Sequence, residues 1–131
     1  SLTGSYSAGG GGGGGGSQPS FFENTSNYTI NDNSTINSPI TVSGRTGNAP
    51  SNLQVSVRII HTYIGDLQVY LIAPDGTSRT LHNRSGGGTD NLITTYTVNA
   101  SSEVANGTWQ LRVRDRANGD VGYLDEWSMQ F

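Results

Sequence analysis

A strict alternation of apolar and polar side chains is the feature that most constrains how this chain can fold. Residues 53–59 place an apolar side chain at every second position, and residues 67–71, 109–113 and 127–131 repeat the pattern. Successive side chains of a β-strand point to opposite faces, so a period of two predicts strands with one buried face. No segment shows the 3.6-residue period of a surface helix. We therefore expect an all-β domain.

Turn-forming residues separate the apolar runs at short intervals. Glycine, proline, asparagine and aspartate gather in residues 31–34, 43–50 and 73–77, where they supply turn geometry. Shorter strands are expected at residues 21–22, 28–30, 40–42, 79–82 and 93–98. About eight strands at this spacing predict a jelly-roll-like β-sandwich.

Eight consecutive glycines, residues 9–16, set the N-terminal segment apart from this pattern. A glycine run loses the most backbone entropy on ordering and has no side chains to bury. We expect residues 1–19 to be a flexible Gly-rich linker and residues 20–131 to be one β-sandwich domain. A linker implies a partner domain on its N-terminal side, although an appended non-native segment is the alternative interpretation.

Composition narrows the classes of partner and site. The chain has no cysteine, which excludes disulfides and cysteine-based metal centres. The net charge is −3, and the densest basic cluster is Arg112, Arg114 and Arg116, which argues against a nucleic-acid partner. No apolar run approaches the roughly 18 residues that cross a bilayer, so no membrane partner is expected. We predict a monomer.

Four sequence motifs in a fixed order resemble those of one family. They are HTYIGDL at residues 61–67, LIAPDGT at residues 71–77, NGTWQL at residues 106–111, and residues 115–122 with Trp127. Together they resemble the P domain, or Homo B domain, of subtilisin-like proprotein convertases and related bacterial secreted proteases. The resemblance runs from about Phe21 to Phe131, and it implies a jelly-roll β-sandwich C-terminal to a secreted protease catalytic domain.

The resemblance also implies a function. It predicts a non-catalytic accessory domain that docks on the N-terminal catalytic domain of a secreted, subtilisin-like serine protease and stabilises it. A metalloprotease parent is the alternative, because bacterial members also occur behind metalloprotease domains. Eukaryotic members usually carry Arg before Gly-Asp, whereas this chain has Ile64, so RGD-type recognition does not transfer. The absent cysteines and the polyglycine linker favour a bacterial, extracellular protein.

A second class of function stays open at this point, namely a module that anchors the parent enzyme to collagen or polysaccharide. Trp109 and Trp127 are the aromatic side chains that such a module would expose. Both lie in phase with apolar neighbours, so we expect them in the core.

Catalytic residues are not predicted in this chain. His61 and Asp66 are five residues apart and close enough to meet, but no serine lies in a GxSxG context. His82 has no acidic neighbour in sequence. We expect His61 to be structural, with ring nitrogens bonded to the adjacent turn.

Residues 115–122 are the best candidate for a calcium site. Asp115, Asn118 and Asp120 supply oxygen atoms in a glycine-containing loop, as calcium requires. The alternative is an Asx-rich loop that binds its own backbone. Asp66 and Asp90 are weaker candidates, because Asp66 is suited to accept local backbone N–H groups and Asp90 follows three glycines of an expected mobile loop. A structural calcium ion is thus predicted, without a choice between loops.

Overall fold

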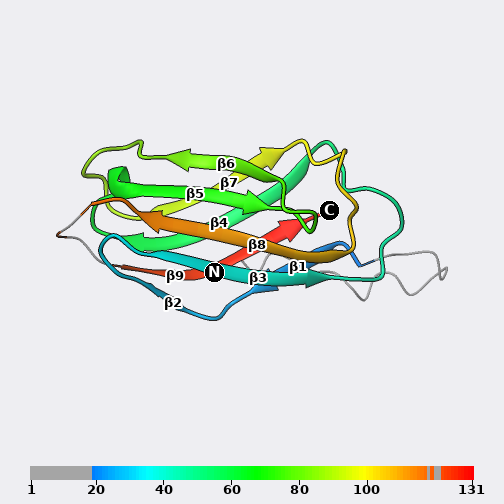
Figure 1. Ribbon diagram of the computed structural model, residues 1–131, viewed down its shortest axis with the longest axis horizontal. Helices are drawn as coiled ribbons and strands as arrows, with labels where there is room; N and C mark the ends of the chain where they lie inside the picture. Colours follow the sequence, from blue (N-terminus) through cyan, green and yellow to red (C-terminus); the bar gives the residue numbers. More distant parts are fainter. Residues whose placement is uncertain (1–18, 118, 120–121) are drawn as a thin grey trace.

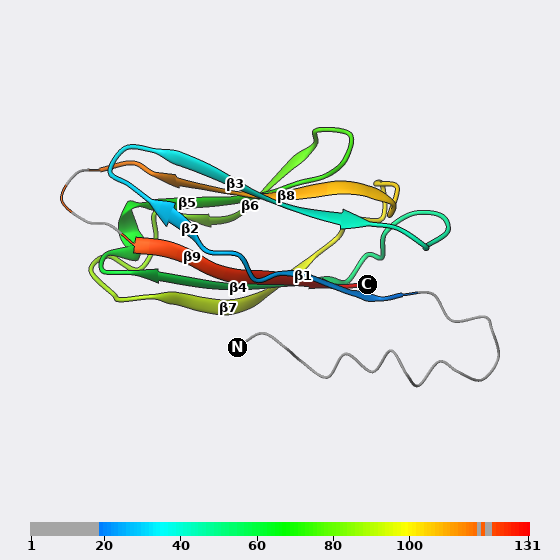
Figure 2. The ribbon, with the colours of Figure 1, turned by 90° about the horizontal axis from the view of Figure 1, so that it is seen from below.

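The computed structural model describes residues 19–117, 119 and 122–131, which form two antiparallel β-sheets packed face to face (Figures 1 and 2). The strands are β1 (Phe21–Asn24), β2 (Tyr28–Ile30), β3 (Thr35–Val42), β4 (Leu53–His61), β5 (Leu67–Ile72), β6 (Ser78–Asn83), β7 (Leu92–Val98), β8 (Gly107–Asp115) and β9 (Gly122–Gln130). A short 3-10 turn, η2 (Ile64–Asp66), precedes β5. The all-β sandwich predicted from the alternation is confirmed, with nine strands in the described residues against about eight expected.

The two sheets join strands that are distant in sequence. One sheet has the order β1-β9-β4-β7, with β2 also paired to β9, and the other has the order β3-β8-β5-β6. The last strand, β9, therefore lies between β4 on one side and both β1 and β2 on the other. This arrangement brings the N- and C-terminal parts of the domain into one sheet and places β2, β9 and β4 side by side at one end of the sandwich.

The core lies between the sheets and follows the alternation. The side chains of Trp109 and Trp127 are 0% exposed, which confirms that they belong to the core. Each indole N–H is satisfied inside the core, because Trp109 Nε1 donates to the Ala105 carbonyl and Trp127 Nε1 donates to Ser38 Oγ, both at 2.9 Å. Burial of these large rings therefore leaves no unpaired indole donor.

β3 is longer than the short strand expected at residues 40–42. It begins at Thr35 and pairs with β8 along its whole length. The polar residue Ser38 occupies a buried position in this strand and accepts the Trp127 hydrogen bond, so the apolar period is interrupted in the sequence although the strand continues.

The expected linker falls outside the described residues except for Pro19. The carbonyl of Pro19 accepts a hydrogen bond of 2.8 Å from Arg45 Nη1. The boundary between residues 19 and 20 thus remains a prediction. Within the described part of the chain, no helix has the length and apolar character needed to cross a membrane.

Candidate functional site

A buried histidine and a buried aspartate join the two sheets at one end of the sandwich. His61 is the last residue of β4 and Asp115 is the last residue of β8. His61 Nε2 lies 3.3 Å from Asp115 Oδ2, and neither side chain has exposed surface. His61 Nδ1 accepts the backbone N–H of Tyr63 at 3.1 Å, so in the neutral ring Nε2 carries the proton and donates to Asp115. Both ring nitrogens are thus engaged, as expected for a structural histidine.

The rest of the Asp115 carboxylate is also engaged. Asp115 Oδ1 accepts the backbone N–H of Ala117 at 3.0 Å, which ties the start of the 115–122 loop to the end of β8. The N–H of Arg116 donates to the Asp66 carbonyl at 2.9 Å, so Asp66 lies directly beside this loop. His61 therefore pairs with Asp115, which lies 54 residues away in the sequence, and not with the nearby Asp66.

The second histidine also holds a turn in place. His82 is buried, and its Nε2 lies 2.9 Å from the carbonyl oxygen of Ile64 in η2. The backbone of Gly65 approaches that of Gly87 so closely that a Cβ on Gly65 would lie 2.9 Å from the Gly87 Cα. Glycine at residue 65 therefore lets the η2 turn pack against the 86–91 loop.

Three of the five predicted calcium ligands lie in the described residues, and these three are not placed together as one metal-binding group. Asp115 is buried and bonded to His61, Asp66 is buried beside it, and Asp90 is exposed on the loop before β7. Asn118 and Asp120 lie outside the described residues. Within residues 19–117, 119 and 122–131, no group of three or more His, Asp or Glu side chains is placed to hold a metal ion.

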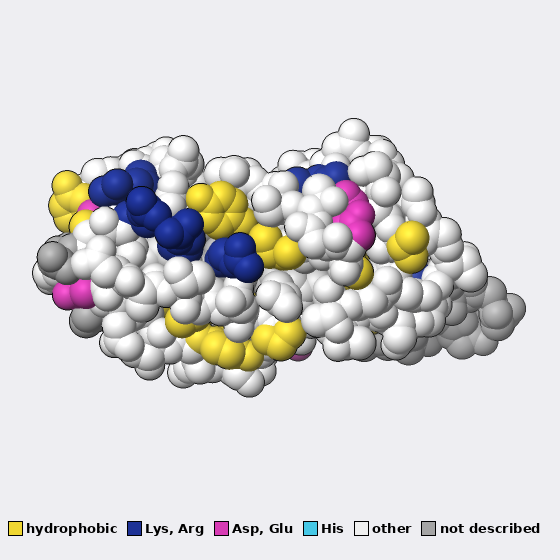
Figure 3. Space-filling view, viewed as in Figure 1, with side chains coloured by type: hydrophobic (Ala, Val, Ile, Leu, Met, Phe, Trp, Pro, Cys, Tyr) yellow, Lys and Arg dark blue, Asp and Glu magenta, His cyan; other side chains and the backbone are white. Residues whose placement is uncertain are grey.

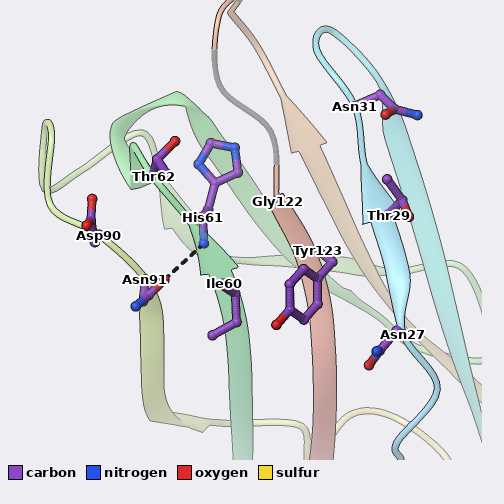
Figure 4. A pocket seen from close by; sticks show the side chains of 10 residues that line it. All are labelled: Asn27, Thr29, Asn31, Ile60, His61, Thr62, Asp90, Asn91, Gly122 and Tyr123. Carbon is purple, nitrogen blue, oxygen red and sulfur yellow. Dashed lines mark hydrogen bonds between the residues drawn. The ribbon is translucent and has the colours of Figure 1, made fainter.

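A pocket of about 590 Å³ opens on the outer face of the β2–β9–β4 sheet (Figure 4). Tyr123 and Ile60 form its floor, with Thr29 beside Tyr123, because Thr29 pairs with Tyr123 across β2 and β9, and Tyr123 pairs with Ile60 across β9 and β4. Residues opposite one another on adjacent strands point to the same face, so the three side chains stand in a row. Tyr123 is 38% exposed in the middle of that row.

Polar side chains border this row on two sides. Asn27 and Asn31 flank Thr29 at two-residue spacing along the β2 segment, and Asp90 and Asn91 approach from the loop before β7. Asn91 Oδ1 accepts the backbone N–H of His61 at 3.1 Å, drawn as the dashed line in Figure 4. The N–H of Asn91 donates back to the His61 carbonyl at 2.8 Å, which fixes the position of this loop beside β4.

Sequence reasoning did not identify this pocket. The phase of β4 does assign Ile60 and Thr62 to the outer face, since residues 53, 55, 57 and 59 point inward. What the sequence does not contain is the pairing of β9 with both β2 and β4, which brings residues nearly one hundred positions apart together.

Comparison with known proteins identifies the family of the chain. The family model described as the proprotein convertase P-domain matches residues 50–131. The chain belongs to the proprotein convertase P-domain family. The resemblance inferred from the four motifs is therefore confirmed.

Similar proteins include several bacterial enzymes. Leupeptin-inactivating enzyme 1 of Streptomyces exfoliatus is 61% identical over 112 residues, which cover 84% of this chain and 26% of the relative. Transglutaminase-activating metalloprotease of Streptomyces mobaraensis is 47% identical over 114 residues, which cover 86% of this chain and 15% of the relative. A calcium-dependent protease of Trichormus variabilis is 37% identical over 87 residues, which cover 59% of this chain and 13% of the relative. This P domain thus spans about a quarter or less of each relative's length.

A solved structure supports the fold. The crystal structure of the serine protease of Aeromonas sobria aligns with a TM-score of 0.57 and 22% identity, over 85% of this chain and 27% of that one. The alignment covers most of the P domain and only a minor part of the larger protein.

Proposed function

We propose that this P domain is a non-catalytic accessory domain of a secreted bacterial protease, which docks on the N-terminal catalytic domain and stabilises it. The observation that carries the proposal is the 61% identity to a bacterial enzyme over 84% of this chain but only 26% of that enzyme. A segment of this size, with its own core, is suited to pack beside a larger domain and to remove part of that domain's surface from solvent.

The two histidines support a non-catalytic role. A serine-protease triad needs an imidazole nitrogen that is free to accept a proton from the nucleophile. Both ring nitrogens of His61 are hydrogen-bonded inside the protein, and its side chain has no exposed surface. His82 is buried as well and contacts the Ile64 carbonyl. His61 and Asp115 are thus the residue types of a catalytic pair. However, solvent and substrate cannot reach the buried imidazole, and neither ring nitrogen is free to accept a proton.

The outer face of the β3-β8-β5-β6 sheet is the surface we propose for docking. Arg112 and Arg114 alternate with buried residues on β8, and Tyr70 and Ile72 lie on the neighbouring strand β5, where Tyr70 pairs with Arg112. We name these four residues the arginine face. Figure 3 shows cationic side chains in a row across this side of the molecule, with hydrophobic side chains beside them.

Charge and composition suit the arginine face to a protein partner. Within the described residues, neither Arg112 nor Arg114 is ion-paired, and Arg112 donates only to the amide oxygen of Asn37 at 3.0 Å. Arginine and tyrosine are among the residues that contribute most at protein interfaces. The complementary surface would be an acidic patch on the catalytic domain, and the chain's net charge of −3 would disfavour other docking orientations.

The catalytic type of the parent remains a proposal of its own. The resemblance implies a subtilisin-like serine protease. The 47% identical relative is named a metalloprotease, which supports the alternative parent. Both types fit an accessory role, because docking depends on the surface of the catalytic domain and not on its chemistry. The sequence of the catalytic domain in the parent protein distinguishes them.

Calcium binding is the finer part of the proposal. The name of the 37% identical relative, a calcium-dependent protease, supports it. Among the described residues, Asp115 fits poorly as a ligand, since its two oxygens already accept bonds from His61 and Ala117 and its side chain is wholly buried. We therefore propose Asn118 and Asp120 as the calcium ligands of the 115–122 loop. Asp115 would hold the start of that loop in place through the Ala117 N–H.

Truncation of the parent protease tests the accessory role. Removal of residues 20–131 should lower the secreted yield and the melting temperature of the catalytic domain, whereas removal of residues 4–16 alone should preserve both. The intact parent should be recovered from the culture medium, as a secreted protein requires. Unchanged yield, stability and activity after removal of residues 20–131 would refute the proposal.

A further inference from the structure

We propose that the pocket around Tyr123 binds a neutral sugar residue of a polysaccharide. This site is on the outer face of the sheet β1-β9-β4-β7, opposite to the arginine face, so the proposal stands independently of docking to a catalytic domain. It gives the P domain a second surface, which would hold the parent enzyme near a carbohydrate.

The pocket combines an apolar floor with a polar border. Ile60 and the ring of Tyr123 form an apolar surface, and the side chains of Thr29, Asn31 and Asp90 stand around it (Figure 4). A pyranose ring has the matching character, since its C–H face is apolar and its hydroxyl groups project around the ring. A volume of about 590 Å³ is within the range of small-ligand sites.

The polar groups of the border are free to bind a ligand. Within the described residues, the side chains of Thr29, Asn31 and Asp90 make no hydrogen bond to the protein. They present a hydroxyl, an amide and a carboxylate, which together donate to and accept from sugar hydroxyls. They approach Tyr123 from both sides of β9, so a ring placed on the tyrosine would reach groups on each side.

The charge of the site favours a neutral ligand. Asp90 is the charged side chain among the lining residues, and it would repel an anionic sugar. Arg58, on the same face of β4 as Ile60, is held by Asp125 at 3.0 Å between Nε and Oδ2. In its hydrogen-bonding orientation, the Asn27 amide nitrogen also donates to Asp125, at 3.0 Å. The charge of Arg58 is therefore already balanced by a local carboxylate.

The position of the site argues against an extended peptide. Peptides that bind β-sheets commonly add a strand to an exposed edge, where backbone groups are unpaired. The pocket floor lies on the face of three paired strands, and the backbone of β9 is paired on both sides at Tyr123. On the floor around Tyr123, recognition therefore comes from side chains.

Two tyrosines of similar exposure give a matched comparison. Tyr123 is 38% exposed on the pocket floor, and Tyr63 is 41% exposed outside the lining residues. The full chain would be titrated with cellohexaose and with chitohexaose, up to about 10 mM, and binding followed by NMR chemical shifts and calorimetry. We expect a Kd near 1 mM or tighter for at least one of these neutral oligosaccharides, with shifts centred on Thr29, Asn31 and Tyr123.

The variants separate stacking from folding. Tyr123→Ala should weaken binding about tenfold, Tyr123→Phe should retain most of it, and Tyr63→Ala should leave it unchanged. Asn31→Ala, in a turn outside the sheets, should weaken binding without affecting the strands. A circular dichroism spectrum and melting curve for each variant establish that it is folded.

Three results would overturn the proposal. The first is that neither neutral oligosaccharide binds, and the second is that binding survives Tyr123→Ala in a folded variant. The third is that, in parallel titrations, only polygalacturonate or a collagen-like triple-helical peptide binds. The last result would place an anionic sugar or a peptide in the role assigned to a neutral sugar.

Discussion

His61 Nε2 contacts Asp115 Oδ2 at 3.3 Å across the sandwich, and both side chains are completely buried. His61 ends β4 in one sheet and Asp115 ends β8 in the other, so this contact joins the two layers at one end. The same two residues fix the turn at Tyr63 and the start of the 115–122 loop through one backbone N–H each. The pair therefore organises the end of the domain that also contains the Tyr123 pocket.

Replacement of Asp115 tests the importance of this pair. Asp115→Ala leaves the His61 Nε2–H and the Ala117 N–H without their acceptor in a buried site, which should lower the free energy of unfolding by about 3 kcal/mol. Asp115→Asn keeps an amide oxygen as an acceptor, so we expect a smaller loss of about 1 kcal/mol. Urea unfolding followed by tryptophan fluorescence measures both values. Equal stability of the wild type and Asp115→Ala would contradict this role.

Gly122 is required where the backbone of β9 passes close to that of β4. A Cβ at this residue would overlap the carbonyl oxygen of Ile60 and lie 2.9 Å from the His61 Cα. Gly122→Ala should therefore force the strands apart and cost about 3 kcal/mol of unfolding free energy.

Gly88→Ala is the matched control for Gly122→Ala. Its Cβ would meet only the exposed Tyr63 ring, at 3.3 Å, and that ring can move. The change in stability should be below about 0.5 kcal/mol. If both alanine variants unfold at the same urea concentration, the close approach at Gly122 is not a constraint on the fold.

Stability at high pH should depend on Tyr96. Partial burial raises the pKa of Tyr96 above its ordinary value of 10.0. Above about pH 10 the unfolded chain loses this proton while the folded chain keeps it, so the unfolded state binds fewer protons and stability falls as pH rises. Below pH 10 the contribution is fully present.

The Tyr96→Phe variant isolates this contribution, since the other tyrosines are unchanged. Urea midpoints at several pH values between 8 and 11 should decline less steeply for Tyr96→Phe than for the wild type. Identical slopes would show that Tyr96 does not account for the loss of stability.

Calcium should stabilise the domain through the 115–122 loop. A ligand that binds only the folded state raises the melting temperature by mass action. After treatment with a chelator, added calcium should raise the melting temperature of the wild type, and Asp120→Asn should abolish this increase. Asp90→Asn, which changes the same kind of side chain on another loop, should preserve it. An increase lost only in Asp90→Asn would move the calcium site to the loop before β7.

Charge on the arginine face should control docking to the catalytic domain. Arg112→Gln combined with Arg114→Gln lowers the net charge by two on this face, and should weaken docking about tenfold or more. Thr94→Glu combined with Asn52→Asp lowers the net charge by two elsewhere, at exposed residues, and should have little effect. Affinity is measured by calorimetry at low and moderate salt, and equal affinities for the two double variants would exclude the arginine face as the docking surface.

Most of the strands could be predicted from the sequence because one side of each faces the core. Residues 53–59 and 109–113 alternate without interruption, and their strands lie where the pattern predicts. β3 was predicted too short, since Ser38 fills a core position as the acceptor for Trp127. A polar residue that is satisfied inside the core carries no signal in a hydrophobic pattern.

The sites are harder to derive because they depend on which strands are neighbours. The sequence separation of 54 residues between His61 and Asp115 is bridged only by packing of the two sheets. The structural role expected for His61 and its bond to the adjacent turn were correct. Its acidic partner and the Tyr123 pocket are not predicted from the sequence. The alternation shows on which face of its strand a side chain lies, but it does not show which strands are neighbours.

Unfolding of the catalytic domain in the presence of this P domain is the most direct test of the accessory role. The separate catalytic domain of the parent protease would be mixed with increasing amounts of the full 131-residue chain and followed by scanning calorimetry. We predict that the melting temperature of the catalytic domain rises with the concentration of the P domain and that the rise is lost with Arg112→Gln and Arg114→Gln together. A melting temperature that is independent of the concentration of the wild-type P domain would contradict the account.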